Sequence, residues 1–335
     1  MIDVEHDHPR LTAPAPAWAI HAGMLTALLL ALLLPGCGSR PVHQPAVVVN
    51  SNADMALGMR AYQDDNYTEA RNYFSRALAQ YRSVDARSGE LYALIDLADS
   101  ALGQGDFAAA RSYLAATDTI TSKQQHADLK ARIDLLQVYA DLQAGENQQA
   151  AKQLDALLAE TSPPTDIRKA ALFARAQVAF DLKSADASAW MDKLGAALGN
   201  SPDAINKARY QRLEALQAQS GNDYQKAAEL YASALDTYRG IYYRPGIAAT
   251  LEEWAGMNMR QKDWTSARGH LERALNVRLS MYDRTHSIRD LDNLMQVDSA
   301  LGAQSATKRA AQLAEYLRNG GDPAQLPPLK NQPGN

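Results

Sequence analysis

The sequence is poor in residues on which several classes of protein depend. It has one cysteine among 335 residues, so a chain cannot build a disulfide framework or a paired-cysteine metal site. It has only four Phe and four Trp, whereas 46% of its residues are hydrophobic, with Ala and Leu prominent. This composition favours closely packed helices over a sheet. With a net charge of −4 and no polybasic run, nothing favours nucleic acid as a partner.

The usual catalytic motifs are missing as well. We find no glycine-rich phosphate loop and no His-Glu-x-x-His sequence. Four of the seven histidines precede residue 44, and His126, His270 and His286 are far apart. The adjacent acids Glu252 and Glu253 diverge on a helix, which is typical of a solvated face. We therefore expect no enzyme activity, no metal, no cofactor and no small-molecule substrate.

The single cysteine follows a short apolar run. Met24–Leu34 reads MLTALLLALLL, which suits a signal-peptide core and is shorter than the roughly 20 residues of a membrane span. Leu34, Gly36 and Cys37 resemble the lipobox of bacterial lipoproteins, in which the cysteine is lipidated after cleavage. Pro35 and the acidic residues before Met24 depart from that pattern. An uncleaved anchor or a buried apolar helix is the alternative.

The lipobox resemblance implies a location for the protein. Residues 1–36 would be the signal peptide, and 37–52 the lipidated Cys37 with a flexible, proline-containing tether. Gly38 stands where an Asp would favour the inner membrane, so the resemblance implies a periplasm-facing outer-membrane lipoprotein. Inner-membrane anchoring remains open, as does a cytoplasmic regulator if residues 1–36 are not a signal.

The rest of the chain repeats one phrase. It is clearest at Gly221–Leu235, GNDYQKAAELYASAL, and returns at Lys262–Leu275 and Asp65–Leu78. Its key alanines are Ala70, Ala227 and Ala267, with weaker copies at Ala110 and Ala150. The steps from 70 to 110, from 110 to 150 and from 227 to 267 are each 40 residues, and such a period indicates a repeat array.

Helical spacing continues from residue 53 to about 318. The expected helix pairs cover residues 53–83, 89–117, 128–159, 167–198, 203–238, 246–282 and 288–317. In the fourth pair, Ala189 is where the motif alanine should fall. Residues 319–335, with four prolines and three glycines, should be disordered.

The strong copies resemble tetratricopeptide repeats. The first-helix motif matches at Leu57–Gly58 and Leu97–Ala98, and the turn matches at Gly105–Phe107, Asp223–Tyr224 and Asp263–Trp264. The resemblance spans about 265 residues, with a period of 40 where about 34 is standard. It implies an all-α helical-hairpin solenoid of six or seven pairs, whose first helices line a groove for a peptide or protein.

Candidate groove residues follow from one turn of helical geometry on the first helices and from the segment YRGIYYR between the fifth and sixth pairs. They are Met55, Met59, Tyr62, Leu135, Tyr139, Arg209, Arg212, Tyr238, Tyr242 and Arg244. Packing against neighbouring helices is the alternative role for each, and Tyr242 and Tyr243 would then wedge adjacent repeats.

Together these patterns predict a non-enzymatic, lipid-anchored scaffold that binds periplasmic or envelope proteins. Two narrower roles stay open. One is an adaptor for an envelope protease or a peptidoglycan enzyme, and the other is a lipoprotein of pilus or secretion assembly.

Overall fold

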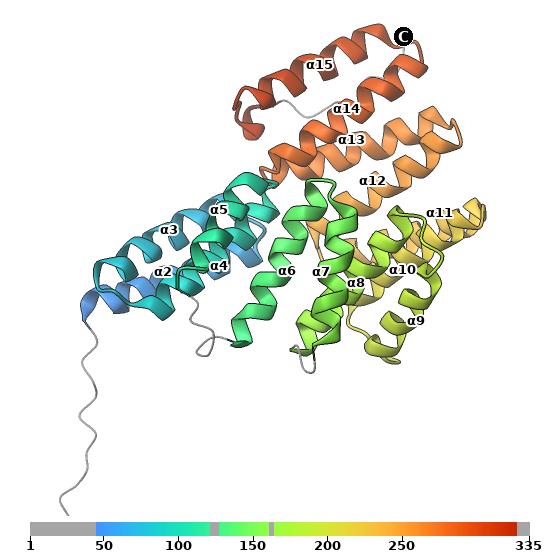
Figure 1. Cartoon of the computed structure of the whole chain (residues 1–335). Coiled ribbons are helices and arrows are strands. Elements are labelled where there is room, and N and C mark those ends of the chain that lie inside the picture. Colours follow the sequence, from blue (N-terminus) through green and yellow to red (C-terminus); the bar gives the residue numbers. More distant parts are fainter. Residues whose placement is uncertain (1–44, 121–126, 161–163, 327–335) are drawn as a thin grey trace, which may run out of the picture. The chain divides into compact units, whose positions relative to one another are not determined.

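The computed structural model describes residues 45–120, 127–160 and 164–326. Within these ranges every regular element is a helix, without a strand, and the described residues from Ala46 onward belong to one structural unit. The prediction of an all-α fold built from consecutive helix pairs is confirmed (Figure 1). The expected signal peptide, Cys37 and residues 327–335 lie outside the described residues.

Seven antiparallel helix pairs follow one another along the described chain. The first helices are α2 (Ala46–Gln63), α4 (Arg87–Gly103), α6 (Ala127–Gln143), α8 (Thr165–Asp181), α10 (Ala204–Ser220), α12 (Arg244–Arg260) and α14 (Arg284–Ala300). The second helices are α3 (Tyr67–Ser83), α5 (Phe107–Thr117), α7 (Asn147–Ala159), α9 (Ala187–Leu198), α11 (Tyr224–Gly240), α13 (Trp264–Ser280) and α15 (Gln304–Arg318). A short 3₁₀ helix, η1 (Pro323–Gln325), follows.

The 40-residue period is a property of the helix starts. The second helices begin at residues 67, 107, 147 and 187, and then, after one shorter step, at 224, 264 and 304. The shorter step follows α9, which has 12 residues and is followed by Gly199 with a φ of 68°. Most first helices have 17 residues, about 25 Å of helix, and this length accounts for a period above the standard one.

Each turn inside a strong pair has the same two devices. The residue before the second helix accepts a hydrogen bond from the backbone N–H three residues on, which caps the helix. The capping residues are Asn66, Asp106, Asp223 and Asp263. The preceding residue has a positive φ, as at Gly105 (71°) and Asn222 (62°). The turn signature read in the sequence is therefore a capping motif.

The repeated phrase is a packing device, as its spacing predicted. Ala227, Tyr231 and Ala234 on α11 are fully buried. In the first pair, α2 approaches α3 so closely that a Cβ at Gly58 would lie 2.5 Å from the Phe74 ring. Small residues thus admit the neighbouring helix, and a large ring fills the space between them.

Both ends of the repeat array extend beyond the expected limits. Helix α2 begins at Ala46, so residues 46–52, assigned to the tether, are helical. Asn52 accepts a hydrogen bond of 2.6 Å from the Tyr81 hydroxyl of α3, which ties this added turn to the pair. At the other end, the Arg284 guanidinium contacts the carbonyls of Gly320 and Gly321, so the predicted disorder is wrong for residues 319–326.

The weak fourth pair differs in register from the prediction. Ala189 is exposed, and the buried stripe of α9 is formed by Ala187, Met191 and Leu194. Their spacing of four and three matches that of Ala70, Phe74 and Ala77 in α3, so Ala187 takes the place of the motif alanine.

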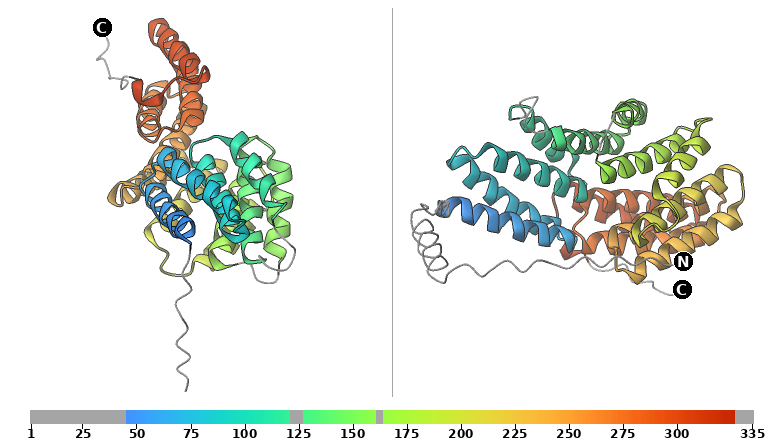
Figure 2. Two further views of the ribbon diagram at one scale, coloured as in Figure 1. Left: turned by 90° about the vertical axis from the view of Figure 1, so that its left-hand side faces the viewer. Right: turned by 90° about the horizontal axis from the view of Figure 1, so that it is seen from below.

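The array curves until its early turns meet its late helices. The Arg244 side chain, at the start of α12, bonds Asp65 at 3.2 Å and the Asp64 carbonyl, in the turn between α2 and α3. The Thr285 hydroxyl, at the start of α14, donates to the Gly105 carbonyl at 2.6 Å. The ribbon views show the first two helix pairs beside the turn between α13 and α14 (Figures 1 and 2). Contacts across 180 residues therefore join the first two pairs to the last two.

Candidate protein-binding groove

A hollow lies along the first helices of pairs three to seven. It has two connected parts, of about 410 and 610 Å³, which share Gln177, Asp181, Glu253 and Arg289 in their walls. We call this hollow the inner groove, and define it by the residues that line either part. From α6 to α14 its main side chains are Tyr139, Phe173, Gln177, Asp181, Arg209, Arg212, Glu252, Glu253 and Arg289.

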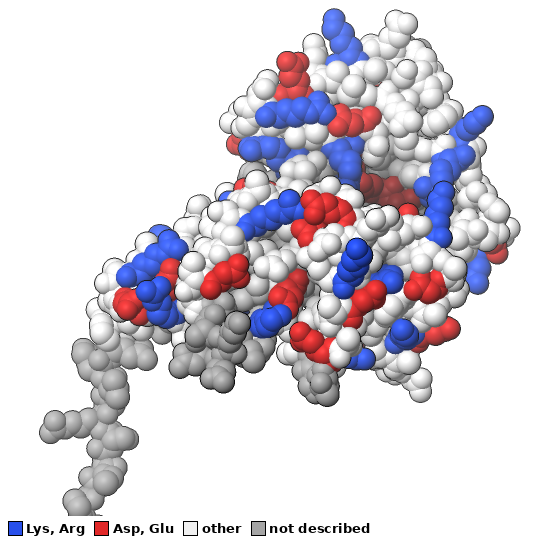
Figure 3. Space-filling view, viewed as in Figure 1, with Lys and Arg blue, Asp and Glu red and all other residues white. Residues whose placement is uncertain are grey.

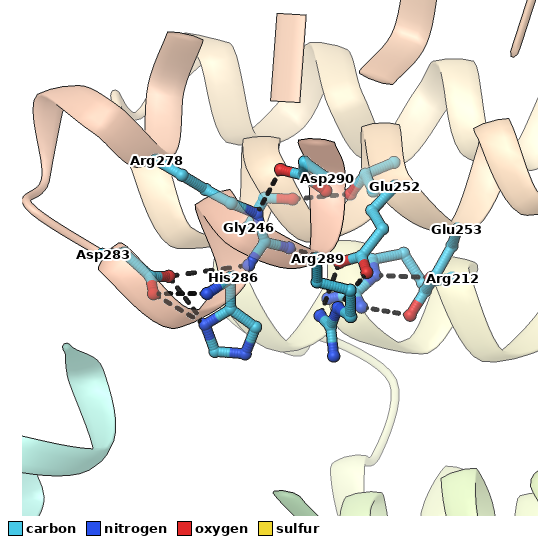
Figure 4. A network of polar contacts seen from close by, with 10 residues as sticks. Arg212, Gly246, Glu252, Glu253, Arg278, Asp283, His286, Arg289 and Asp290 are labelled. Carbon is cyan, nitrogen blue, oxygen red and sulfur yellow. Dashed lines mark hydrogen bonds and ion pairs between the residues drawn. The ribbon is translucent and has the colours of Figure 1, made fainter. Parts of the chain in front are cut away.

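Two ion pairs stabilise the α12 side of the groove. Arg212 on α10 donates to Glu253, with its Nε 2.9 Å from Oε2, and Arg289 on α14 lies 2.6 Å from Glu252 (Figure 4). Burial alone would lower the pKa of Arg212, but Glu253 raises it above its ordinary value. Both glutamates are half-buried and paired, so their assignment to a solvated face is wrong.

Behind Glu252 lies a buried charge network centred on Arg278. This guanidinium contacts Glu252, lies 3.0 Å from Asp290 and lies 3.5 Å from Asp283. His286 in turn contacts Asp283, with its Nδ1 at 2.8 Å (Figure 4). The network joins α12, α13 and α14, and so fixes the wall from which Glu252 and Arg289 project.

A second polar cluster joins the first helices of the first three pairs. The Tyr62 hydroxyl donates to Asp99 at 3.0 Å, and Arg132 donates to Asp99 and Asp96 at 3.1 and 2.8 Å. Burial, with Asp99 nearby, raises the pKa of Tyr62 well above its ordinary value, so this phenol stays a neutral donor. The cluster fixes α2, α4 and α6 against one another.

The structure brings three of the predicted residues together in the inner groove: Tyr139, Arg209 and Arg212. Met55 packs in the core of the first pair, and Tyr62 belongs to the Asp99 cluster. Met59 is 37% exposed on α2 and lies apart from the two cavities. Contact of any of these residues with a partner stays a prediction.

Two predicted groove residues are in the core instead. Leu135 is 4% exposed and packs against helices α7 and α8, and Tyr238 is fully buried. A Cβ at Gly246 would lie 2.6 Å from the Tyr238 ring, so α12 closes directly over this side chain. Tyr238 therefore has no surface to offer a partner.

The turn after α11 combines three different roles. Tyr242 is 86% exposed, whereas Tyr243 packs on Tyr238 with 5.5 Å between ring centroids. Only Tyr243 wedges the adjacent repeats. Arg244 bonds the turn of the first pair and serves as an internal contact.

Sequence reasoning missed Phe173, Gln177 and Arg289 as groove residues. Phe173 lines the cavity and also packs in the α8 core. The period could have identified Arg289, because it stands two 40-residue repeats after Arg209. For Gln177, on the weakest repeat, the sequence carries no such signal.

The histidines of the described chain have local partners. His270 stacks on Trp254 at 4.4 Å, and burial, assisted by Arg273, lowers the pKa of His270 to about 4. His286 faces the Phe107 edge and Asp283. Among the residues that the structure describes, no three His, Cys, Asp or Glu side chains form a group suited to a metal ion. Likewise, none of the described helices combines the length and apolar character needed to cross a membrane.

No protein-family model and no curated protein matches this chain. Among solved structures it is similar to the apo form of RapI, with a TM-score of 0.46 at 12% identity, covering 81% of this chain and 77% of that one. It is similar to a tetratricopeptide repeat protein from Parabacteroides merdae ATCC 43184, with a TM-score of 0.42 at 14% identity over 79% and 99%. BtubC (BKLC) from P. vanneervenii gives 0.32 at 15% over 87% and 98%.

Proposed function

We propose that this protein is a non-enzymatic scaffold whose inner groove binds a segment of another protein. The observation that most supports this proposal is the groove itself, which is lined by first helices from five consecutive pairs. Its walls mix aromatic rings, amides and charged groups, which are the side chains that recognise extended peptides.

The charge distribution supports a protein partner. Arginines and carboxylates of the groove are interspersed and largely paired with each other, as in Arg212 with Glu253. On the face seen in Figure 3, basic and acidic side chains are also interspersed, without a field of one sign. A nucleic-acid partner would favour a continuous basic surface.

The proposed location is the periplasmic face of the outer membrane, with attachment through a lipid on Cys37. This part of the proposal rests on the lipobox-like sequence before Cys37 and on Gly38. Its test is metabolic labelling with palmitate. We expect the wild type to be labelled and Cys37→Ser to be unlabelled, and labelling of the variant would exclude the anchor.

Site-specific photo-crosslinking tests the groove. A photoreactive amino acid replaces Gln177, in the wall shared by both cavities, and as a matched control replaces Glu229, exposed on α11. We expect crosslinked protein adducts from position 177 in cells and few from position 229. Adducts from position 229 alone would place the interaction outside the groove, and their absence from both would argue against a scaffold role.

A further inference from the structure

Arg209 differs from the other arginines of the inner groove. Arg212 and Arg289 line the same 410 Å³ cavity, and each is paired with a glutamate. Arg209 makes no ion pair with any carboxylate in the described part of the chain. Its guanidinium lies 5.0 Å from the centre of the Phe173 ring and contacts the Tyr139 hydroxyl. The Arg209 guanidinium is thus positioned by Phe173 and Tyr139, and it has no carboxylate partner among the described residues.

A guanidinium in these surroundings favours an anionic partner. The surroundings of Arg209 are an aromatic face and neutral phenols, which stabilise a guanidinium less than a carboxylate does. Burial raises the pKa of Tyr139, which opposes ionisation of this phenol even though Arg209 acts in the other direction. Tyr139 therefore remains a neutral partner, and the positive charge of Arg209 remains uncompensated.

The balance of charge in the cavity points the same way. Its walls hold three arginines, Arg209, Arg212 and Arg289, and two acids, Asp181 and Glu253, and Arg289 is paired with Glu252 of the adjoining part of the groove. Glu253 is compensated by Arg212. Asp181 accepts a hydrogen bond from Gln177, and burial raises the pKa of this carboxyl. Arg209 is thus the arginine of this cavity whose charge no described carboxylate compensates, and an anionic group of a ligand would compensate it.

We propose that the inner groove binds an acidic peptide segment, and that the carboxylate of an internal Asp or Glu side chain forms an ion pair with Arg209. This inference rests on the proposed scaffold function and specifies its ligand chemistry. The groove continues on both sides of Arg209, towards Tyr139 and Leu142 at α6 and towards Trp264 at α13. A chain that passes through can therefore present a side chain to the guanidinium.

The test uses the full-length protein and rhodamine-labelled nonapeptide pools with blocked ends, measured by fluorescence anisotropy. One pool has Glu at its centre, and the other has Gln in the same randomised surroundings. We expect the Glu pool to bind about 10- to 100-fold more tightly, because a bidentate guanidinium–carboxylate pair gives differences of this size. Equal affinities, or no binding of either pool, would overturn the proposal.

Three variants assign the effect to Arg209. In Arg209→Gln the affinity for the Glu pool should fall to that for the Gln pool, and Arg209→Lys should recover part of it. Arg273→Gln, an exposed arginine on α13, removes the same charge outside the groove and should leave affinity unchanged. Far-UV circular dichroism checks that each variant is folded. Undiminished binding by folded Arg209→Gln contradicts the proposal.

The source of the carboxylate is tested separately. A third pool has a central Gln and a free C-terminus. If it binds more tightly than the Glu pool and loses affinity in Arg209→Gln, Arg209 recognises a chain end and the internal residue is wrong. The scaffold function is judged independently, because crosslinking from position 177 can succeed while Arg209→Gln has no effect.

Discussion

Replacement of Asp290 by Asn gives the sharpest test of the buried network behind the groove. Asp290 is 0% exposed, and its Oδ2 lies 3.0 Å from Arg278 Nε. Neither oxygen accepts a well-aligned hydrogen bond from a described residue. Arg278 also forms ion pairs with Glu252 and Asp283, so three carboxylates share one guanidinium. Burial raises the pKa of Asp290 to about 8, against the opposing effect of Arg278.

The effect of pH on the free energy of unfolding follows from the difference in the pKa of Asp290 between the unfolded and folded states. An unfolded Asp releases its proton near pH 4, whereas folded Asp290 keeps it to about pH 8. Between these values the folded state binds one more proton, so the free energy of unfolding falls as pH rises. The slope is at most about 1.4 kcal/mol per pH unit. Asn resembles the protonated acid and cannot ionise, so Asp290→Asn should lack this slope.

Urea unfolding, followed by far-UV circular dichroism at pH 5, 6, 7 and 8, measures the difference. The free energy of unfolding of Asp290→Asn relative to wild type should rise by up to about 1.4 kcal/mol with each pH unit. Asp292→Asn is the matched control, since Asp292 is an exposed acid of α14 paired with Arg318 at 2.6 Å. Parallel pH profiles for wild type and Asp290→Asn would show that Asp290 is ionised throughout, and would refute the reasoning.

Three further substitutions test packing and turns by urea denaturation. Tyr231→Ala should cost about 3–5 kcal/mol, because the ring is fully buried between repeats; a loss below 1 kcal/mol would mean that the core collapses around the cavity. Tyr242→Gly should stabilise by about 1 kcal/mol, because an exposed Tyr there has a φ of 56°, and a lower midpoint would contradict this. Arg244→Ala should lower the free energy of unfolding by about 1–3 kcal/mol, because it leaves Asp65 half-buried and unpaired. The control Arg239→Ala removes an exposed ion pair and should cost under 1 kcal/mol. Equal losses for the two variants would show that the contact between Arg244 and Asp65 does not stabilise the fold.

The repeat phrase made the fold predictable because its information is local. A capping Asp, a positive-φ turn residue and alanines spaced for a close helix approach each act within about 15 residues. Copies of the phrase therefore locate a helix pair wherever they occur. Where the phrase weakens, in α9, the register prediction failed, because Ala187 and Ala189 are equally small and only burial separates them.

The groove was less predictable because first helices are enclosed on most sides. On α4, buried residues run almost continuously from Leu91 to Ala98. Helical periodicity then no longer separates a groove face from a core face. Leu135 and Tyr139 stand one turn apart on α6, yet Leu135 is core and Tyr139 lines the cavity. Spacing alone assigned them the same role.

The contacts between distant repeats could not be predicted from any local sequence pattern. In a solenoid each repeat ordinarily contacts only its neighbours, so stability is a sum of adjacent interfaces. Here Arg244 and Thr285 bond turns of the first and second pairs, at positions that depend on the accumulated rotation of every pair between. These bonds constrain the curvature that brings α6, α8, α10, α12 and α14 around one hollow. The width of the inner groove is thus controlled partly by residues that do not line it, and a substitution at Arg244 should alter binding at Arg209 without touching the ligand.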